Sequence, residues 1–263
     1  MNQLDKIVAQ KRAEIARLRD SMSIEYMQSA ASIRASRASF IEALSASPMG
    51  LIAEIKRRSP SAGEIRPDMN VADIAEQYEE AGAHAVSVLI DQSFFGGGES
   101  DFVSVRNTVD LPMLYKEFVL FGWQVWHAAS LGASAVLLIA AILSDDQLQG
   151  LSQLAESAGV TPLVEVHTAE ELDRVLALGA TCIGVNNRDL RTFETRVETS
   201  LELAGKVSGD VLLISESGIR SAEDVVRLRD AGYRGILVGE HLLKQPDVGV
   251  GIRELMSQAW ASS

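Results

Sequence analysis

The chain has 263 residues, of which 47% are hydrophobic, and a formal net charge of −12. This hydrophobic content is enough for a large core, so the length allows one α/β barrel or two smaller domains. The acidic charge argues against nucleic acid or an anionic membrane surface as the main partner. Cys182 is the single cysteine, which excludes an intramolecular disulfide framework and suits a reducing compartment.

The amino-terminal segment bears on the location of the protein. Residues 1–20 carry charges throughout and lack the apolar core of a signal peptide. No stretch of the chain approaches the roughly 20 apolar residues that a membrane-spanning helix needs. We therefore expect a cytoplasmic protein without a membrane partner, and we expect it to be a monomer.

Residues 1–49 are predicted to form two helices, the second over about residues 32–46. These helices are expected to pack on the bottom of the following domain or on one side of its mouth. From residue 50 onward, short runs rich in Val, Ile and Leu recur. They cover residues 50–56, 85–90, 113–118, 135–140, 161–167, 182–187, 211–217 and 235–240. Most are apolar on consecutive residues, which is typical of parallel strands that are covered on both faces.

Segments of helical periodicity lie between these runs, for example over residues 71–82, 144–159, 168–179 and 221–232. Ser144, Thr168 and Ser221 each precede an acidic first turn, which predicts a helix N-cap. Four helices are expected to end at Gly82, Gly132, Gly179 and Gly232, which are about 50 residues apart, or two βα units. Eight such units fit a closed barrel better than an open doubly wound sheet. The predicted fold is a single (β/α)8 TIM barrel over residues 50–263 with an amino-terminal helical extension over residues 1–49.

Polar residues at the carboxyl ends of the predicted strands are the candidate site residues, because barrels of this kind carry their working groups there. They are Glu54 and Lys56 on the first strand, Lys116 and Glu117 on the third, Glu165 and His167 on the fifth, Asn186, Asn187 and Arg188 on the sixth, Glu216 and Ser217 on the seventh, and Gly239 and Glu240 on the eighth. Side chains two residues apart share a face of a strand. Glu54 and Lys56 should therefore point the same way, and Lys116 and Glu117 should point in opposite directions.

These ionisable groups predict an active site, although an internal salt-bridge network without catalysis would place them similarly. For His167 taken alone, a structural role is favoured. No set of His, Asp and Glu has metal-ligand spacing, so no metal site is predicted. The seventh and eighth strands end in glycine-containing turns at residues 216–219 and 237–240, where barrels commonly bind phosphate on backbone N–H groups. No GxGxxG follows the first strand, which argues against dinucleotide binding.

Residues 52–65, IAEIKRRSPSAGEI, resemble the signature of the indole-3-glycerol phosphate synthase family. The segments LYKEF, LVEVH, IGVNNRDLRTF and ISESGI follow in the order of that family, and the resemblance covers about residues 50–245. The family closes the indole ring of a phosphorylated substrate, a carboxyphenylamino-deoxyribulose phosphate, and releases carbon dioxide and water. The resemblance implies this lyase activity in tryptophan biosynthesis and no cofactor.

The resemblance also implies a role for each matching residue. Lys116 would be the general acid that protonates the ketone, Glu165 the acid/base partner in the dehydration, and Lys56 the group that binds the substrate carboxylate and assists proton transfer. The remaining roles concern binding: Glu54 and Asn186 hold the anilino and hydroxyl groups, Arg188 and Glu216 support this polar shell, Ser59, Ser217, Gly218, Gly239 and Glu240 lie in or near phosphate-binding segments, and Phe95 belongs to an aromatic wall. A lysine among other cations in a partly dry site loses proton affinity, so we expect Lys116 to donate a proton near neutral pH.

The sequence departs from the pattern of the family near the predicted general acid. Ile90 stands where Thr is usual, Tyr115 where Arg is frequent, and Glu117 where Asp is common. Leu120–Phe121–Gly122 replaces a segment close to Val-Asp-Pro, in a loop expected to order over the substrate.

These departures leave two further hypotheses open besides the synthase. One is a barrel of this family altered by engineering for another reaction, such as Kemp elimination. There, a carboxylate desolvated against Phe95 and Phe121 would abstract a carbon-bound proton. The other is a non-catalytic binding or scaffold protein, against which the retained lysines and carboxylates argue.

Overall fold

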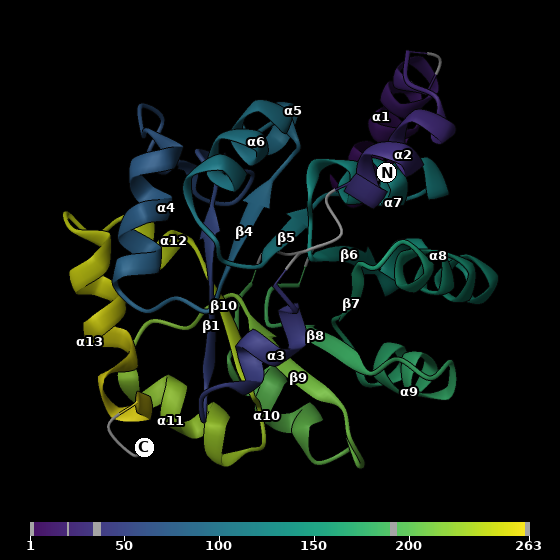
Figure 1. Cartoon of the computed structure of the whole chain (residues 1–263). Coiled ribbons are helices and arrows are strands. Elements are labelled where there is room, and N and C mark those ends of the chain that lie inside the picture. The colour runs from purple at the N-terminus through teal and green to yellow at the C-terminus, as the bar shows by residue number, and fades with distance from the viewer. Residues whose placement is uncertain (1–2, 20, 34–37, 190–193, 261–263) are drawn as a thin grey trace.

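The computed structural model describes residues 3–19, 21–33, 38–189 and 194–260. Eight parallel strands form a closed barrel in the order β1-β10-β9-β8-β7-β6-β5-β4, and the helices between them surround it (Figure 1). The strands are β1 (Gly50–Ile55), β4 (Ala85–Leu89), β5 (Met113–Lys116), β6 (Ala135–Ile139), β7 (Thr161–Val166), β8 (Cys182–Asn186), β9 (Leu212–Glu216) and β10 (Gly235–Val238). The predicted TIM barrel is confirmed.

Each predicted apolar run is a strand of this barrel, and each strand ends one or two residues before its predicted run does. The polar residues at those ends leave the hydrogen-bonded ladder and enter the turns above it. A small hairpin after β1 was not predicted, in which β2 (Arg58–Ser59) pairs antiparallel with β3 (Gly63–Glu64). Strands of two residues are too short to show a periodicity in the sequence.

The helices around the barrel are α4 (Val71–Glu80), α5 (Gln92–Phe95), α6 (Glu99–Thr108), α7 (Gly122–Leu131), α8 (Asp145–Ser157), α9 (Ala169–Ala177), α10 (Glu198–Ala204), α11 (Ala222–Asp230), α12 (Glu240–Leu243) and α13 (Val248–Trp260), with a 3-10 turn, η1 (Ala140–Ile142). The predicted caps are confirmed, since the hydroxyls of Ser144, Thr168 and Ser221 accept a backbone N–H from the first turn of their helices. The four predicted helix-ending glycines all have positive φ. None of the described helices is both long and apolar enough to cross a membrane.

The amino-terminal extension contains α1 (Gln3–Leu18), α2 (Ile24–Ile33) and α3 (Phe40–Ser45). The predicted single helix over residues 32–46 is wrong: Ala38 and Ser39 are not helical, and residues 34–37 lie outside the described part. Ser39 has extended backbone and accepts the N–H of Glu42, so it begins a new helix as its N-cap. A serine in the middle of an apparently helical segment can thus be the N-cap of a new helix instead of an interior residue of one long helix.

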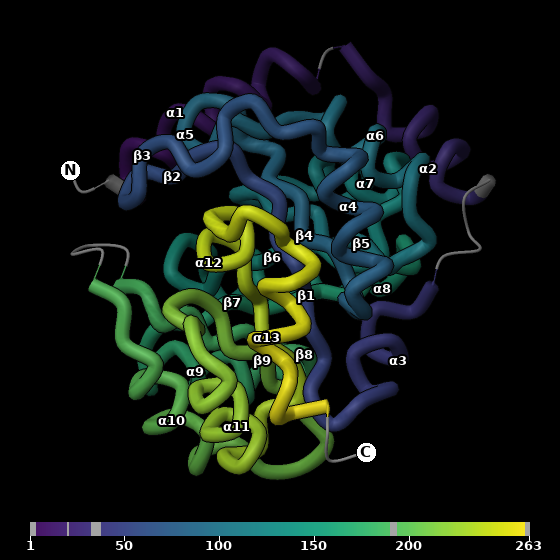
Figure 2. Tube along the Cα trace, turned by 90° about the vertical axis from the view of Figure 1, so that its left-hand side faces the viewer, coloured from purple at the N-terminus to yellow at the C-terminus, as the bar shows by residue number. Residues whose placement is uncertain are grey.

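The two ends of the extension lie at opposite ends of the molecule (Figure 2). Phe40 and Leu44 of α3 are fully buried and pack with Ile52 at the amino ends of the strands. In contrast, α1 lies beside α5, near the carboxyl ends of β4 and β5. The extension therefore covers the bottom of the barrel with α3 and flanks its mouth with α1.

Alternation along each strand separates two apolar layers. Outward residues such as Val86 and Val88 pack under the helices, whereas inward residues such as Leu114 and Leu137 fill the lower interior of the barrel. Above this apolar plug, the inward positions become ionisable. The fold thereby places charged side chains at the top of a closed apolar cylinder.

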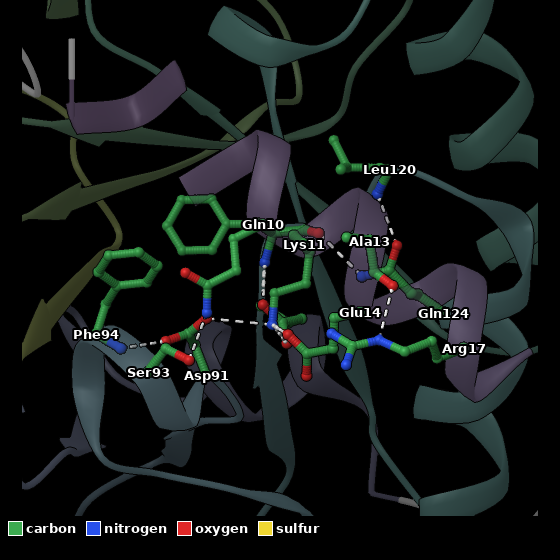
Figure 3. A network of polar contacts seen from close by, with 12 residues as sticks. Gln10, Lys11, Ala13, Glu14, Arg17, Asp91, Ser93, Phe94, Leu120 and Gln124 are labelled. Carbon is green, nitrogen blue, oxygen red and sulfur yellow. Dashed lines mark hydrogen bonds and ion pairs between the residues drawn. The ribbon is translucent and has the colours of Figure 1, made fainter. Parts of the chain in front are cut away.

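The segment after β5 is fixed by one buried side chain, that of Gln124 in α7. Its Oε1 accepts the N–H group of Leu120 at 2.8 Å (Figure 3) and that of Phe121 at 3.2 Å, while its Nε2 donates to the carbonyl of Phe118 at 2.9 Å. Leu120 is buried in the core, and the Arg12 guanidinium lies 5.6 Å from the centre of the Phe121 ring. Gln124 thus fixes the backbone of the segment between β5 and α7.

We expect Gln124→Ala to lower the free energy of unfolding by about 2–4 kcal/mol, because it leaves buried backbone groups without a partner at roughly 1–3 kcal/mol each. Denaturant unfolding measures this loss. The matched control is Gln147→Ala, since Gln147 accepts the N–H of Ser144 on an exposed helix end. An equal loss in both variants would show that burial of the Gln124 contacts adds nothing.

Candidate active site

A pocket of about 520 Å³ opens at the carboxyl ends of the strands. Nearly all predicted site residues line it, namely Glu54, Lys56, Phe95, Lys116, Glu165, Asn186, Arg188, Glu216, Ser217, Gly218, Gly239 and Glu240. Ser59 does not. Its buried hydroxyl accepts the N–H of Ala62 at 3.1 Å and lies 3.3 Å from the hydroxyl of Ser61, which does line the pocket.

Lys116 lies among carboxylates near the centre of the pocket. Its Nζ is 2.5 Å from Glu216 Oε2 and 3.2 Å from Glu165 Oε2. Burial alone would lower the pKa of Lys116, but Glu216, Glu165 and Glu54 outweigh it and raise this pKa above its usual range. The expectation that Lys116 loses proton affinity among cations is therefore wrong. Lys116 is a firmly protonated ammonium.

The two carboxylates that share Lys116 differ in proton affinity. Burial raises the pKa of Glu216 to about 7, although Lys116 partly opposes this shift. Burial would also raise the pKa of Glu165, but Lys116 and His167 hold it below its usual value. Of these two carboxylates, Glu216 therefore holds a proton more readily and Glu165 stays ionised more readily. Environments that separate two pKa values in this way are typical of acid and base pairs in active sites.

Glu54 and Lys56 share a face of β1, as predicted, because Lys56 Nζ bonds to Glu54 Oε1. The Tyr78 hydroxyl donates to the Glu54 carbonyl at 3.2 Å and fixes the end of the strand. A Cβ at Gly239 would lie 2.7 Å from Glu54 Oε1. The turn after β10 therefore approaches this carboxylate so closely that a side chain at residue 239 would displace Glu54.

The turn after β9 is strained. Ser217 has φ +67° and is the only non-glycine residue with positive φ in the described ranges. Gly218 follows with φ +79°, and a Cβ there would lie 2.6 Å from Thr195 Cγ2. A non-glycine residue in this backbone region costs of order 1–3 kcal/mol and is frequent at functional sites.

Cationic side chains border these turns at the mouth of the pocket. Arg188 Nη1 donates to the Ser61 hydroxyl at 2.7 Å, and its Nη2 lies 3.5 Å from Glu240 Oε2. Arg220 and Lys244 also line the pocket, and neither was predicted from the sequence. The side of the pocket next to Ser217 and Gly218 thus combines positively charged side chains with the backbone of a turn. Such a combination suits the binding of an anionic group.

The opposite side of the pocket is apolar. The rings of Phe95 and Phe118 lie 6.2 Å apart, and Leu4 and Ile7 of α1 complete this wall. Leu4, Ile7 and Phe118 were not predicted. The sequence suggested that the extension could flank the mouth of the barrel, but an amphipathic helix does not indicate which of its apolar residues reach a pocket.

The Lys11 cluster, formed by Lys11, Glu14, Asp91 and Glu117, ties α1 to this wall (Figure 3). The Lys11 side chain is 1% exposed, and its Nζ lies 2.9 Å from Glu117 Oε2, 3.1 Å from Asp91 Oδ2 and 2.9 Å from Glu14 Oε2. Burial would lower the pKa of Lys11, but the carboxylates raise it above its usual range. Glu117 points away from Lys116, as predicted, and its longer side chain reaches Lys11.

The other departures from the family pattern lie outside the pocket. Tyr115 points outward, where its hydroxyl is 3.1 Å from His127 Nδ1 and its ring meets Phe102 edge-on. Ile90 packs against the outer core. Leu120, Phe121 and Gly122 do not line the pocket of the free protein, and the expectation that they order over bound substrate stays a prediction. Phe121 also cannot provide the apolar wall that the repurposed barrel would need.

Solved structures with similar folds are TIM-barrel proteins. A mutant tryptophan synthase alpha-subunit from Pyrococcus furiosus matches with a TM-score of 0.60 and 14% identity, over 80% of this chain and 98% of that one. Thiamine phosphate pyrophosphorylase from the same organism matches with a TM-score of 0.59 and 17% identity, over 80% of this chain and 95% of that one. At these identities the likeness concerns the fold alone.

Sequence relatives are more specific. A protein of Chloroherpeton thalassium described as indole-3-glycerol phosphate synthase is 44% identical over 92% of this chain and 95% of its own length. A protein of Bacteroides thetaiotaomicron with the same description is 42% identical over 96% of this chain and 97% of its own length. The family model described as indole-3-glycerol phosphate synthase matches residues 4–255. The chain therefore belongs to the indole-3-glycerol phosphate synthase family.

Proposed function

We propose that this chain catalyses the reaction of its family, the closure of 1-(2-carboxyphenylamino)-1-deoxyribulose 5-phosphate to indole-3-glycerol phosphate with loss of carbon dioxide and water. The observation that carries the proposal is the protonated Lys116 between Glu165 and Glu216, at distances of 3.2 and 2.5 Å. An aromatic wall flanks this centre on one side, and cationic side chains flank the turns on the other. The pocket thereby matches a substrate with an aryl group, a reactive ketone and a phosphate.

In the first step, the aromatic carbon that carries the carboxylate attacks the ketone carbon. Lys116 donates a proton to the ketone oxygen, which becomes a hydroxyl group. Because the pKa of Lys116 is raised, its ammonium is intact near neutral pH when substrate binds. Loss of carbon dioxide returns the bonding electrons to the ring and restores its aromaticity.

In the second step, the new hydroxyl group leaves as water with a proton supplied by the site, and the intermediate loses a proton to a base. Glu165 is ionised and lies beside Lys116, so it suits the role of the base. Glu216, whose pKa burial raises to about 7, holds a proton at the right pH to reload Lys116. The steps need only proton transfer and charge stabilisation, with no cofactor.

The other residues bind the substrate in this proposal. Lys56 takes the substrate carboxylate in place of Glu54, while Glu54 and Asn186 hold the anilino and hydroxyl groups. Phe95 packs on the aryl ring, Arg188 and Glu216 complete the polar shell, and the segments with Ser59, Ser217, Gly218, Gly239 and Glu240 receive the phosphate. In this proposal, residues 1–49 are an extension of a single catalytic barrel. The protein acts as a monomer in the cytoplasm.

An assay of the purified chain with the carboxyphenylamino substrate tests the proposal directly. We expect indole-3-glycerol phosphate to form, followed by its fluorescence or absorbance. The assay should cover roughly pH 5 to 9, because such acid and base groups titrate in this range. A folded protein that forms no indole product at any of these pH values would refute the proposal.

Inorganic phosphate should raise the unfolding midpoint, because a ligand that binds only the native state stabilises it as its concentration passes Kd. Gly218→Ala should weaken this protection, since a Cβ would displace the Thr195 side chain beside the turn. Gly179→Ala is the matched control, because Gly179 has φ +83° with nothing within 4 Å of an added Cβ. Equal protection in both variants would place the phosphate elsewhere.

A further inference from the structure

His167 is a largely buried residue that the proposed reaction does not use. Its side chain is 10% exposed and lies between two carboxylates: Nε2 is 3.4 Å from Glu165 Oε1, and Nδ1 is 3.5 Å from Glu171 Oε2. These are contacts between opposite charges and not hydrogen bonds: among the described residues, neither ring nitrogen has a hydrogen-bond partner. The ring does not line the pocket, so any effect on the substrate must pass through Glu165.

Glu171 holds this histidine in a fixed place. Glu171 lies in the first turn of α9, where its N–H donates to the Thr168 hydroxyl at 3.2 Å. Its Oε2 also accepts the backbone N–H of His167 at 2.7 Å. The same oxygen therefore contacts the backbone and the ring of His167, and it leaves Nε2 facing Glu165. A carboxylate that orients an imidazole toward a second reactive group is a recurring arrangement in active sites.

We infer that His167, held by Glu171, is a positioning residue that keeps Glu165 ionised and directed at the substrate during the dehydration. The inference rests on the role of Glu165 in the proposed function. One oxygen of Glu165 accepts a hydrogen bond from Lys116 at 3.2 Å and the other faces His167 Nε2 at 3.4 Å, so basic side chains lie on both sides of the carboxylate. A base held from both sides keeps its orientation through the reaction.

The charges around the pair give a direction for its pH dependence. Glu165 faces Lys116 of β5, Asn186 of β8, Glu216 of β9 and His167. Burial would lower the pKa of His167, but Glu171, Glu165 and Glu216 raise it above its usual value. The imidazolium in turn lowers the pKa of Glu165. A neutral residue at 167 should therefore raise the pKa of the base, and the acid limb of the kcat profile should move to higher pH.

The kinetic test compares His167→Gln, Glu171→Gln and the double variant across pH. We expect the acid limb of His167→Gln to move up by about one pH unit, which is the low end of the effect of a nearby opposite charge. KM should change less than about threefold, because binding groups are untouched. Glu171→Gln should move the limb in the same direction by less. The double variant should match His167→Gln, since Glu171 acts through the histidine.

Glu170→Gln is the matched control for Glu171→Gln, because Glu170 is an exposed neighbour in the same helix turn. Its profile should match that of the parent. A uniform loss of kcat at all pH values in His167→Gln, with the limb unmoved, would show a merely structural role and overturn the inference.

A titration separates the inference from the proposed function. In nitrogen-15 NMR of the labelled histidines, assigned with His167→Gln, both Glu165→Gln and Glu171→Gln should lower the pKa of His167. If neither variant does so, the inference fails even in an enzyme that forms indole product. If both do so in a chain without synthase activity, the carboxylate–imidazole pair stands and the proposed function fails.

Discussion

Lys116→Met should lower kcat for indole-3-glycerol phosphate formation by about a thousandfold, within the range expected for a lost general acid. Substrate affinity should stay within roughly tenfold, because a proton transferred in the transition state contributes little to ground-state binding. Single-turnover kinetics and equilibrium titration with substrate measure the two effects separately. A variant that keeps more than about a tenth of the parent activity would rule out Lys116 as the general acid.

Stability has to be followed in the same variant, because Lys116 neutralises two buried carboxylates. Removing one partner of a buried ion pair typically costs about 3–5 kcal/mol. Glu216 can reduce this cost by holding a proton, since burial already raises its pKa to about 7. Lys116→Met combined with Glu216→Gln should therefore be more stable than Lys116→Met alone and equally inactive. Recovery of activity in the double variant would mean that misfolding, and not the lost acid, explained the single one.

Lys11→Met should lower the free energy of unfolding by about 3–5 kcal/mol, because it leaves Glu117 and Asp91 buried without their cation. It should also raise KM more than it lowers kcat, since Leu4 and Ile7 of the same helix line the apolar wall. Denaturant unfolding and steady-state kinetics measure the two effects.

Lys6→Met is the matched control, because Lys6 is an exposed lysine of the same helix and lies outside the Lys11 cluster. It should change neither quantity measurably. Glu117→Gln in the Lys11→Met background should restore part of the stability by removing the unpaired charge. If Lys11→Met lowers the free energy of unfolding while KM stays constant, α1 only stabilises the fold and does not shape the pocket.

The parts of the fold that could be predicted are those where one local pattern has one structural meaning. A strand covered on both faces, such as β6, must be apolar along its length, and a serine before an acidic turn, such as Ser144, caps a helix. The positions of Lys116 and Glu165 followed because barrels place reactive groups at the ends of their strands. The strand and the helix cap each depend on fewer than about 20 consecutive residues, and the site positions depend on the repetition of such units along the chain.

The properties that could not be predicted depend on contacts between distant segments. The proton affinity of Lys116 is set by carboxylates on β7 and β9, and only the closed barrel reveals that they surround it. Leu4 and Ile7 reach the pocket because Lys11 is buried against Glu117, more than 100 residues away.

The barrel closes where β1 pairs with β10, with Gly50 opposite Gly235. The closing contact therefore joins segments 185 residues apart (235 minus 50), and every strand between them must be in register first. Until then, β1 and β10 are open edges with free backbone donors and acceptors, which readily pair with other chains. Such long-range closure is slow compared with the formation of local contacts. A chain that stops before residue 235 lacks β10, leaves β1 and β9 as permanent open edges and would tend to aggregate, although it would carry most of the pocket.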